Sequence, residues 1–157
     1  MNMISGTLLL VEDNRDDVFF LQRALQKANI PAPVEVAEDG QTAIDYLKAA
    51  MERRELARQP LPSLVLLDLK IPYVSGFEIL KWIREQPALA NLPVVILTSS
   101  PEQRDREMAL ALGANGYLVK PPTAEMMREL LTSLCIAASP QVMPDNGIVA
   151  ERQQPRL

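Results

Sequence analysis

A run of four aliphatic residues, Leu64 to Leu67, ends directly in an aspartate, Asp68. Pro72 and Gly76 follow a few residues later, as expected for a loop. A continuous apolar run of this length is typical of a strand that is buried on both faces of a parallel sheet. In open α/β sheets, ligands bind just beyond the carboxyl ends of such strands. Asp68 is therefore either a functional carboxylate or a turn aspartate, and the run alone does not decide between the two.

The rest of the chain alternates between short apolar runs and amphipathic segments. Helices are predicted from Asn14 to Ala28, from Gly40 past Met51, from Gly76 to Pro87, after Ser100, and from Thr123 to Ala137. Five strands alternating with five helices predict an α/β fold, a doubly wound sheet of five parallel strands flanked by five helices. The predicted strands are residues 8–11, 34–37, 64–67, 93–98 and 116–119.

The helix after the fourth strand carries a start signal of its own. Ser100 is predicted as its N-cap, with Pro101 at the first helical position. Met108, Ala111 and Leu112 are predicted to form its buried face.

Composition excludes several classes of protein. The 157 residues contain no histidine, which removes Ser-His-Asp triads and histidine-ligated zinc sites. A single cysteine allows no internal disulfide and fits a reducing, cytoplasmic location. No apolar run reaches the roughly 20 residues that a membrane span needs. The net charge of −4 argues against nucleic acid as a partner.

The chain is expected to form one domain, residues 1–138, followed by a tail. Residues 139–157 contain three prolines and one glycine and little apolar content, so they read as a C-terminal tail. No output domain is expected after the last helix.

Unusual polar residues follow four of the predicted strands: Glu12 and Asp13, Asp68, Thr98, and Lys120. Parallel strands bring their carboxyl ends to one edge of the sheet, so three carboxylates would lie close together and repel one another. Mg²⁺ is the cation that best suits a few carboxylates and several waters. Asp68 would then be able to attack an electrophilic phosphorus atom. Lys120 and the Thr98 hydroxyl would hold the phosphoryl oxygens.

These residues resemble the motifs of the response-regulator receiver domains of two-component signalling. The resemblance covers roughly residues 7–137 and is specific because all of the motifs occur together. It rests on Val11-Glu12-Asp13-Asn14, on Leu67-Asp68 followed by Pro72 and Gly76, on Thr98 with Tyr117, and on Lys120-Pro121.

The resemblance implies a strand order of 2-1-3-4-5 and assigns roles to the site residues. Asp68 would be the phosphorylated residue. Asp13 and Asp68 would bind Mg²⁺ directly, Glu12 mainly through water, and Lys70 through its backbone carbonyl. Thr98 and Tyr117 would form the switch: Thr98 moves toward the phosphoryl group, and Tyr117 then turns inward.

The resemblance also implies partners. The long second helix and the segment Asp-Leu-Lys-Ile-Pro at residues 68–72 resemble single-domain regulators that partner cyanobacterial phytochrome-type histidine kinases. A sensor histidine kinase is therefore the expected partner. A homodimer is expected through the fourth helix, fifth strand and fifth helix, on a surface including Arg104, Met108, Met126 and Met127.

Two other protein classes fit the sequence less well. An aspartate-nucleophile phosphatase would carry a second aspartate where Lys70 stands, and a flavin-binding protein of this fold would not place carboxylates after the first strand. The protein is thus expected to catalyse only its own phosphorylation and dephosphorylation. A phosphate sink or shuttle in a phosphorelay, and a receiver-like module without phosphorylation, remain open.

Overall fold

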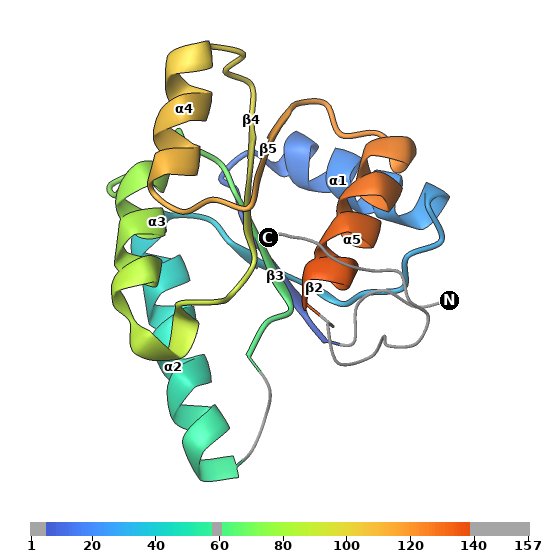
Figure 1. Cartoon of the computed structure of the whole chain (residues 1–157). Coiled ribbons are helices and arrows are strands. Elements are labelled where there is room, and N and C mark those ends of the chain that lie inside the picture. The colour runs from blue at the N-terminus through green and yellow to red at the C-terminus, as the bar shows by residue number, and fades with distance from the viewer. Residues whose placement is uncertain (1–5, 58–60, 139–157) are drawn as a thin grey trace.

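The computed structural model describes residues 6–57 and 61–138 (Figure 1). Strands and helices alternate along these residues. In chain order the elements are β1 (Leu8–Val11), α1 (Arg15–Lys27), β2 (Val34–Ala37), α2 (Gly40–Ala57), β3 (Leu64–Leu67), α3 (Gly76–Glu85), a 3-10 turn (Pro87–Leu89), β4 (Val94–Thr98), α4 (Gln103–Ala111), β5 (Gly116–Val119) and α5 (Ala124–Ala138).

The five strands form one sheet in the order β2-β1-β3-β4-β5, and every neighbouring pair is parallel. The fold class and the strand order predicted from the sequence are therefore confirmed. In the centre of the sheet, Val11 at the end of β1 lies level with Leu67 at the end of β3. The residues that follow these two strands consequently leave the sheet side by side.

Each face of the sheet is covered by helices, with α1 and α5 on one side and α2, α3 and α4 on the other (Figure 1). Because successive side chains of a strand point to opposite faces, β1 and β3 supply both layers of the core. Leu8 and Leu10 pack with Leu21 of α1 and Met127 of α5. Leu9 and Val11 of β1 point to the opposite face of the sheet and pack in the layer formed with α2 and α3. The strands that position the site are thus fixed from both sides.

Two helices, α1 and α3, begin where they were predicted, and each is capped by side chains of neighbouring residues. The side chain of Asn14 accepts hydrogen bonds from the backbone N–H groups of Asp16 and Asp17, at 2.8 and 3.1 Å, and so caps α1. Ser75 and Glu78 cap α3 with reciprocal hydrogen bonds between side chain and backbone. Both caps satisfy backbone donors that have no partner inside the helix.

The start of α4 and part of its buried face were predicted wrongly. The helix begins at Gln103, and the hydroxyl of Ser100 does not cap it but donates to Asp105 Oδ2 at 2.6 Å. Met108 is 48% exposed and Ala111 is exposed as well. Leu112 packs against the core as predicted, and Ala109 is fully buried. The helix is therefore turned so that a small side chain, rather than Met108, faces the sheet.

The last helix begins at Ala124, one residue later than predicted, because Thr123 lies at its N-terminus and bonds the backbone N–H of Met126. Met127 was expected on an interaction surface, but its side chain is fully buried against β1 and β3. That expectation was wrong. The predicted tail, residues 139–157, lies outside the described residues.

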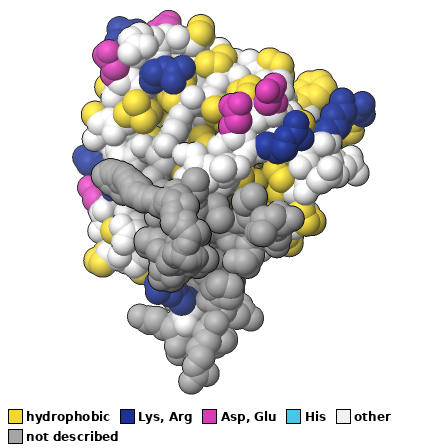
Figure 2. Space-filling view, turned by 45° about the vertical axis from the view of Figure 1, so that its right-hand side comes forward, with side chains coloured by type: hydrophobic (Ala, Val, Ile, Leu, Met, Phe, Trp, Pro, Cys, Tyr) yellow, Lys and Arg dark blue, Asp and Glu magenta, His cyan; other side chains and the backbone are white. Residues whose placement is uncertain are grey.

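Among the described residues, no helix combines the length and the apolar character needed to cross a membrane. Figure 2 shows acidic and basic side chains interspersed on the face in view, with no continuous stripe of one sign. A stripe of basic side chains is the usual electrostatic mark of a nucleic-acid interface, and this face does not carry one.

Candidate functional site

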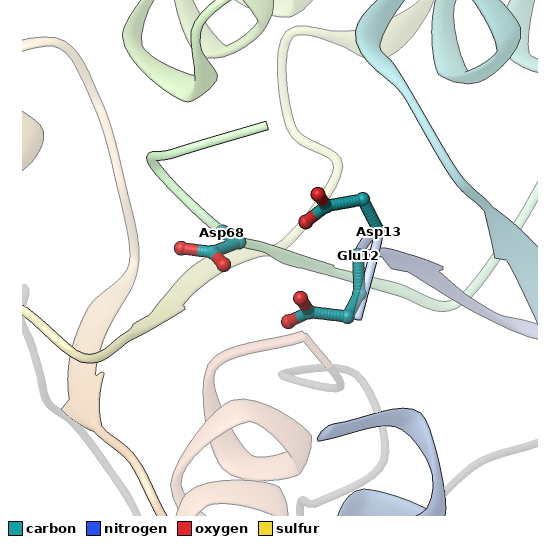
Figure 3. Close-up of side chains that lie close together, drawn as sticks. All are labelled: Glu12, Asp13 and Asp68. Carbon is teal, nitrogen blue, oxygen red and sulfur yellow. The ribbon is translucent and has the colours of Figure 1, made fainter. Parts of the chain in front are cut away.

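Three carboxylates lie beyond the ends of the two central strands (Figure 3). Glu12 and Asp13 follow β1, and Asp68 follows β3. The backbone N–H of Asp68 donates to the carbonyl of Val11 at 3.2 Å, which continues the pairing of the strands up to the site. The sheet itself therefore holds these side chains together.

The three carboxylates are close enough to share a cation. One oxygen from each of Glu12, Asp13 and Asp68 lies within 4.8 Å of the others. Glu12 and Asp68 are buried, whereas Asp13 is exposed. Three oxygen donors that open to solvent on one side suit Mg²⁺, which takes few protein carboxylates and keeps several waters. The donor set therefore fits the predicted metal.

The ammonium group of Lys120 lies among carboxylates as well. Its Nζ donates to Glu12 Oε1 at 2.6 Å, to Asp17 Oδ2 at 2.8 Å and to Asp68 Oδ2 at 2.9 Å. The side chain of Lys120 is only 11% exposed. The peptide bond that follows it, Lys120–Pro121, is cis. Lys120 follows β5, at the edge of the sheet, so a long side chain is what reaches the central strands.

Burial and ion pairing act in opposite directions on the charges of this site. Burial raises the pKa of Glu12 above its usual value, and this effect outweighs the hydrogen bond from Lys120 that lowers it. Burial alone would lower the pKa of Lys120, but the hydrogen bonds to Asp17, Glu12 and Asp68 outweigh it, so the pKa of Lys120 is raised. Lys120 is therefore a cation at neutral pH.

Asp68 is held through both of its carboxylate oxygens. Oδ2 accepts from Lys120, and Oδ1 accepts from the backbone N–H of Lys70 at 3.3 Å. Gly76 allows the loop to close tightly here, because a Cβ at that position would clash with the carbonyl oxygen of Asp68. The glycine predicted as part of the Asp68 loop thus has a steric reason to be there. The role of the Lys70 carbonyl as a metal ligand stays a prediction.

Thr98 ends β4, the strand next to β3. Its side chain is fully buried, and its hydroxyl is the buried side-chain group that lacks a hydrogen-bond partner within the described part of the chain. Such a group is costly to leave unpaired, and few native proteins do so without a reason. An oxygen acceptor beyond the end of β3 would provide that reason.

Tyr117 already lies inward. Its side chain is buried, and its hydroxyl donates to the backbone carbonyl of Ser100 at 2.8 Å. The guanidinium of Arg106, from α4, lies 4.8 Å from the centre of the Tyr117 ring. The inward position expected only after phosphorylation is therefore reached in this structure through contacts with the β4–α4 loop and α4.

Asp17 also contacts this site, although it was not among the site residues predicted from the sequence. It lies in the first turn of α1 and contacts Lys120. One signal was available: α1 begins two residues after Asp13, and side chains in the first turn of a helix tilt toward its N-terminus. That tilt aims Asp17 back toward the edge of the sheet where Glu12 stands.

Comparisons with known proteins point to one family. The family model described as "Response regulator receiver domain" matches residues 8–132. The response regulator Rcp1 of Synechocystis is 35% identical over 72% of this chain and 75% of its own length. One similar solved structure is the phosphorylated cyanobacterial phytochrome response regulator RcpA, which is 32% identical over 83% of this chain and 91% of its own, with a TM-score of 0.65. Another is the Mn²⁺-bound form of Rcp1, which is 28% identical over 94% of this chain and 100% of its own, with a TM-score of 0.62.

The family match extends from the first residue of β1 into α5, and so includes every strand end that contributes to the site. The acidic cluster, the buried lysine and the strand order agree with the same family. The chain belongs to the response-regulator receiver domains of two-component signalling.

Proposed function

We propose that this protein accepts a phosphoryl group from a sensor histidine kinase on Asp68. The observation that carries the proposal is the contact of Asp68 with Lys120 inside a cluster of carboxylates that suits Mg²⁺. In the reaction, an oxygen of the ionised Asp68 attacks phosphorus, the P–N bond of the donor phosphohistidine breaks, and the imidazole leaves. Hydrolysis of the aspartyl phosphate by water returns Asp68 and inorganic phosphate.

Mg²⁺, when bound by Asp13, Asp68 and the carbonyl of Lys70, with Glu12 acting through water, would offset the negative charge gathered there. Lys120 neutralises part of the charge on Asp68 and donates a hydrogen bond to a phosphoryl oxygen in place of Asp68 Oδ2. Thr98 supplies a second donor, since its hydroxyl has no hydrogen-bond partner among the described residues. Both donors then act where negative charge increases during transfer.

The phosphoryl group would be read out through Thr98 and Tyr117. It brings about −1.5 to −2 charges and three acceptor oxygens. Shifting the populations of two conformations from 1:99 to 99:1 takes about 5.5 kcal/mol of differential binding. One charge-assisted hydrogen bond gives only about 1.5–3 kcal/mol, so Lys120 and Thr98 must act together. Because Tyr117 already lies inward, the expected effect is to hold that position more firmly.

The responding surface is the face formed by α4, β5 and α5, with Arg104 and Met108 exposed on α4 and Met126 partly exposed on α5. A homodimer, or a change in kinase contact, through this face is the proposed output, without nucleic acid as a partner. The similarity to RcpA and Rcp1 supports a phytochrome-type kinase as the donor. A sink or shuttle in a phosphorelay would use the same chemistry and differ in having no responding partner.

The test is phosphorylation by acetyl phosphate, followed by intact mass. With Mg²⁺ we expect one added phosphoryl group, and with chelator or in Asp68→Asn we expect none. Asp45→Asn is the matched control, because Asp45 is an exposed aspartate on α2. A modification that persists in Asp68→Asn would refute the proposal. For the switch, beryllofluoride-induced self-association should be weaker in Thr98→Ala than in wild type.

A further inference from the structure

The hydrogen-bonding capacity of the Lys120 ammonium is fully used. An ammonium group has three donors, and three carboxylates accept from Lys120, at 2.6 to 2.9 Å. The acceptors come from three different elements: Glu12 follows β1, Asp68 follows β3, and Asp17 lies on α1. Any new acceptor therefore has to replace one of these three.

Asp17 differs from the other two acceptors. Glu12 and Asp68 are members of the acidic cluster in which a cation would bind, whereas Asp17 is not. Phosphorylation would also remove the charge of the Asp68 carboxylate, so the hydrogen bond to Asp68 passes to a phosphoryl oxygen. The contact between Lys120 and Asp17 is the one that neither the cation nor the phosphoryl group needs to break.

The backbone of Asp17 is held firmly in place. Its backbone N–H is held by the Asn14 side chain at 3.1 Å, in the capped first turn of α1. Its side chain is 31% exposed, so water screens the pair and the contact orients Lys120 more than it adds to stability. Asp17 thus offers a fixed acceptor on the solvent side of an otherwise buried ammonium.

We propose that Asp17 is a positioning residue that anchors Lys120 toward Asp68 throughout the phosphorylation cycle. The inference rests on the proposed function, because it concerns the lysine that would stabilise the transferred phosphoryl group. Without the anchor, Lys120 keeps only acceptors whose charge is altered by the cation or by phosphorylation. Transfer should then slow, although Asp17 touches no reacting atom.

The experiment measures the initial rate of phosphorylation of the full chain by acetyl phosphate at saturating Mg²⁺, by intact mass. Asp17→Asn should be slower than wild type by about twofold to fivefold, the range for a partly exposed ion pair. Asp17→Glu should recover more than half of the lost rate, because it keeps the charge. Asp16→Asn is the matched control: it removes a charge from the same helical turn, and Asp16 is exposed. Its rate should equal that of wild type.

The outcomes separate this inference from the proposed function. If wild type is phosphorylated on Asp68 but Asp17→Asn is as fast or faster, the anchor is refuted and the proposed function stands. If Asp17→Glu loses as much rate as Asp17→Asn, the shape of the side chain matters and not its charge, which also refutes the anchor. If wild type acquires no phosphoryl group, both fail. Thermal unfolding of each variant, compared with Asp16→Asn, identifies a rate loss that is due to unfolding.

Discussion

Replacing Lys120 by methionine should destabilise the fold strongly, because it leaves buried carboxylates without a cation. The side chains of Glu12 and Asp68 are 3% and 9% exposed, so water can solvate neither well. Breaking a buried ion pair by removing one partner costs about 3–5 kcal/mol. Asp17, at 31% exposure, adds little to this figure. The loss would be a large part of the roughly 5–15 kcal/mol that stabilises a typical domain.

Urea denaturation at pH 7 with chelator measures this loss of unfolding free energy. Lys81→Met, on the exposed side of α3, is the matched control and should change it by less than about 0.5 kcal/mol. Adding Glu12→Gln to Lys120→Met should recover part of the loss, because one of the repelling charges is removed. Mg²⁺ should also stabilise Lys120→Met more than wild type, since it replaces the missing cation. A Lys120→Met variant within about 1 kcal/mol of wild type would refute the reasoning.

The same pair of proteins gives a pH dependence with a defined sign. The pKa of Lys120 is raised from 10.5 in the folded state. The contribution of Lys120 to the unfolding free energy is therefore fully present below pH 10.5, and it is lost only as the pH rises through the higher pKa of the folded state. The difference in unfolding free energy between wild type and Lys120→Met should thus persist up to pH 10.5 and shrink above it. A difference that vanishes between pH 8 and 10 would contradict the ion pairing.

Three further substitutions test other parts of the structure by chemical denaturation. Thr98→Val should leave the unfolding free energy unchanged or raise it by up to about 1 kcal/mol, because it removes a buried hydroxyl that has no hydrogen-bond partner in the described part of the chain. The same substitution should weaken beryllofluoride binding. Arg84→Met should lower the unfolding free energy by about 2–3 kcal/mol, because the guanidinium donates hydrogen bonds to several groups, among them the carbonyls of Gly113 and Leu89. Tyr73→Asn should raise the unfolding free energy by up to about 1 kcal/mol. Tyr73 is 88% exposed and has φ of +71°, a left-handed conformation that asparagine adopts more readily than tyrosine. A change of opposite sign in any of the three would contradict its stated cause.

The fold and most of the site could be predicted because the relevant signals are local. Unbroken apolar runs mark β1, β3 and β4 as buried strands, and each of these runs ends in the polar residue that contributes to the site. A parallel sheet brings such ends to one edge, and β1, β3 and β4 are neighbours in it. Asn14 likewise caps α1 through residues two and three positions away. Predictions of this kind depend on few residues at a time.

The parts that were missed depend on packing between distant segments. Residues 108–112 are all apolar, so the sequence does not reveal which of them faces the sheet, and Met108 was assigned to the core in place of Ala109. Met127 has the character of an interface residue, but α5 turns it into the layer beneath α1. Asp17 and Lys120 are separated by 103 residues, and only the folded structure shows that they touch.

The most direct test of the proposed phosphoryl-acceptor site is ¹⁹F NMR of the protein with beryllofluoride, which mimics a phosphoryl group. With Mg²⁺ we expect resonances of bound fluoride that disappear on chelation and in Asp68→Asn, because binding needs both the metal and the Asp68 carboxylate. They should weaken in Thr98→Val, which removes one of the proposed donors. The absence of bound fluoride at saturating Mg²⁺, or its persistence in Asp68→Asn, would contradict the site described for Asp68, Lys120 and the acidic cluster.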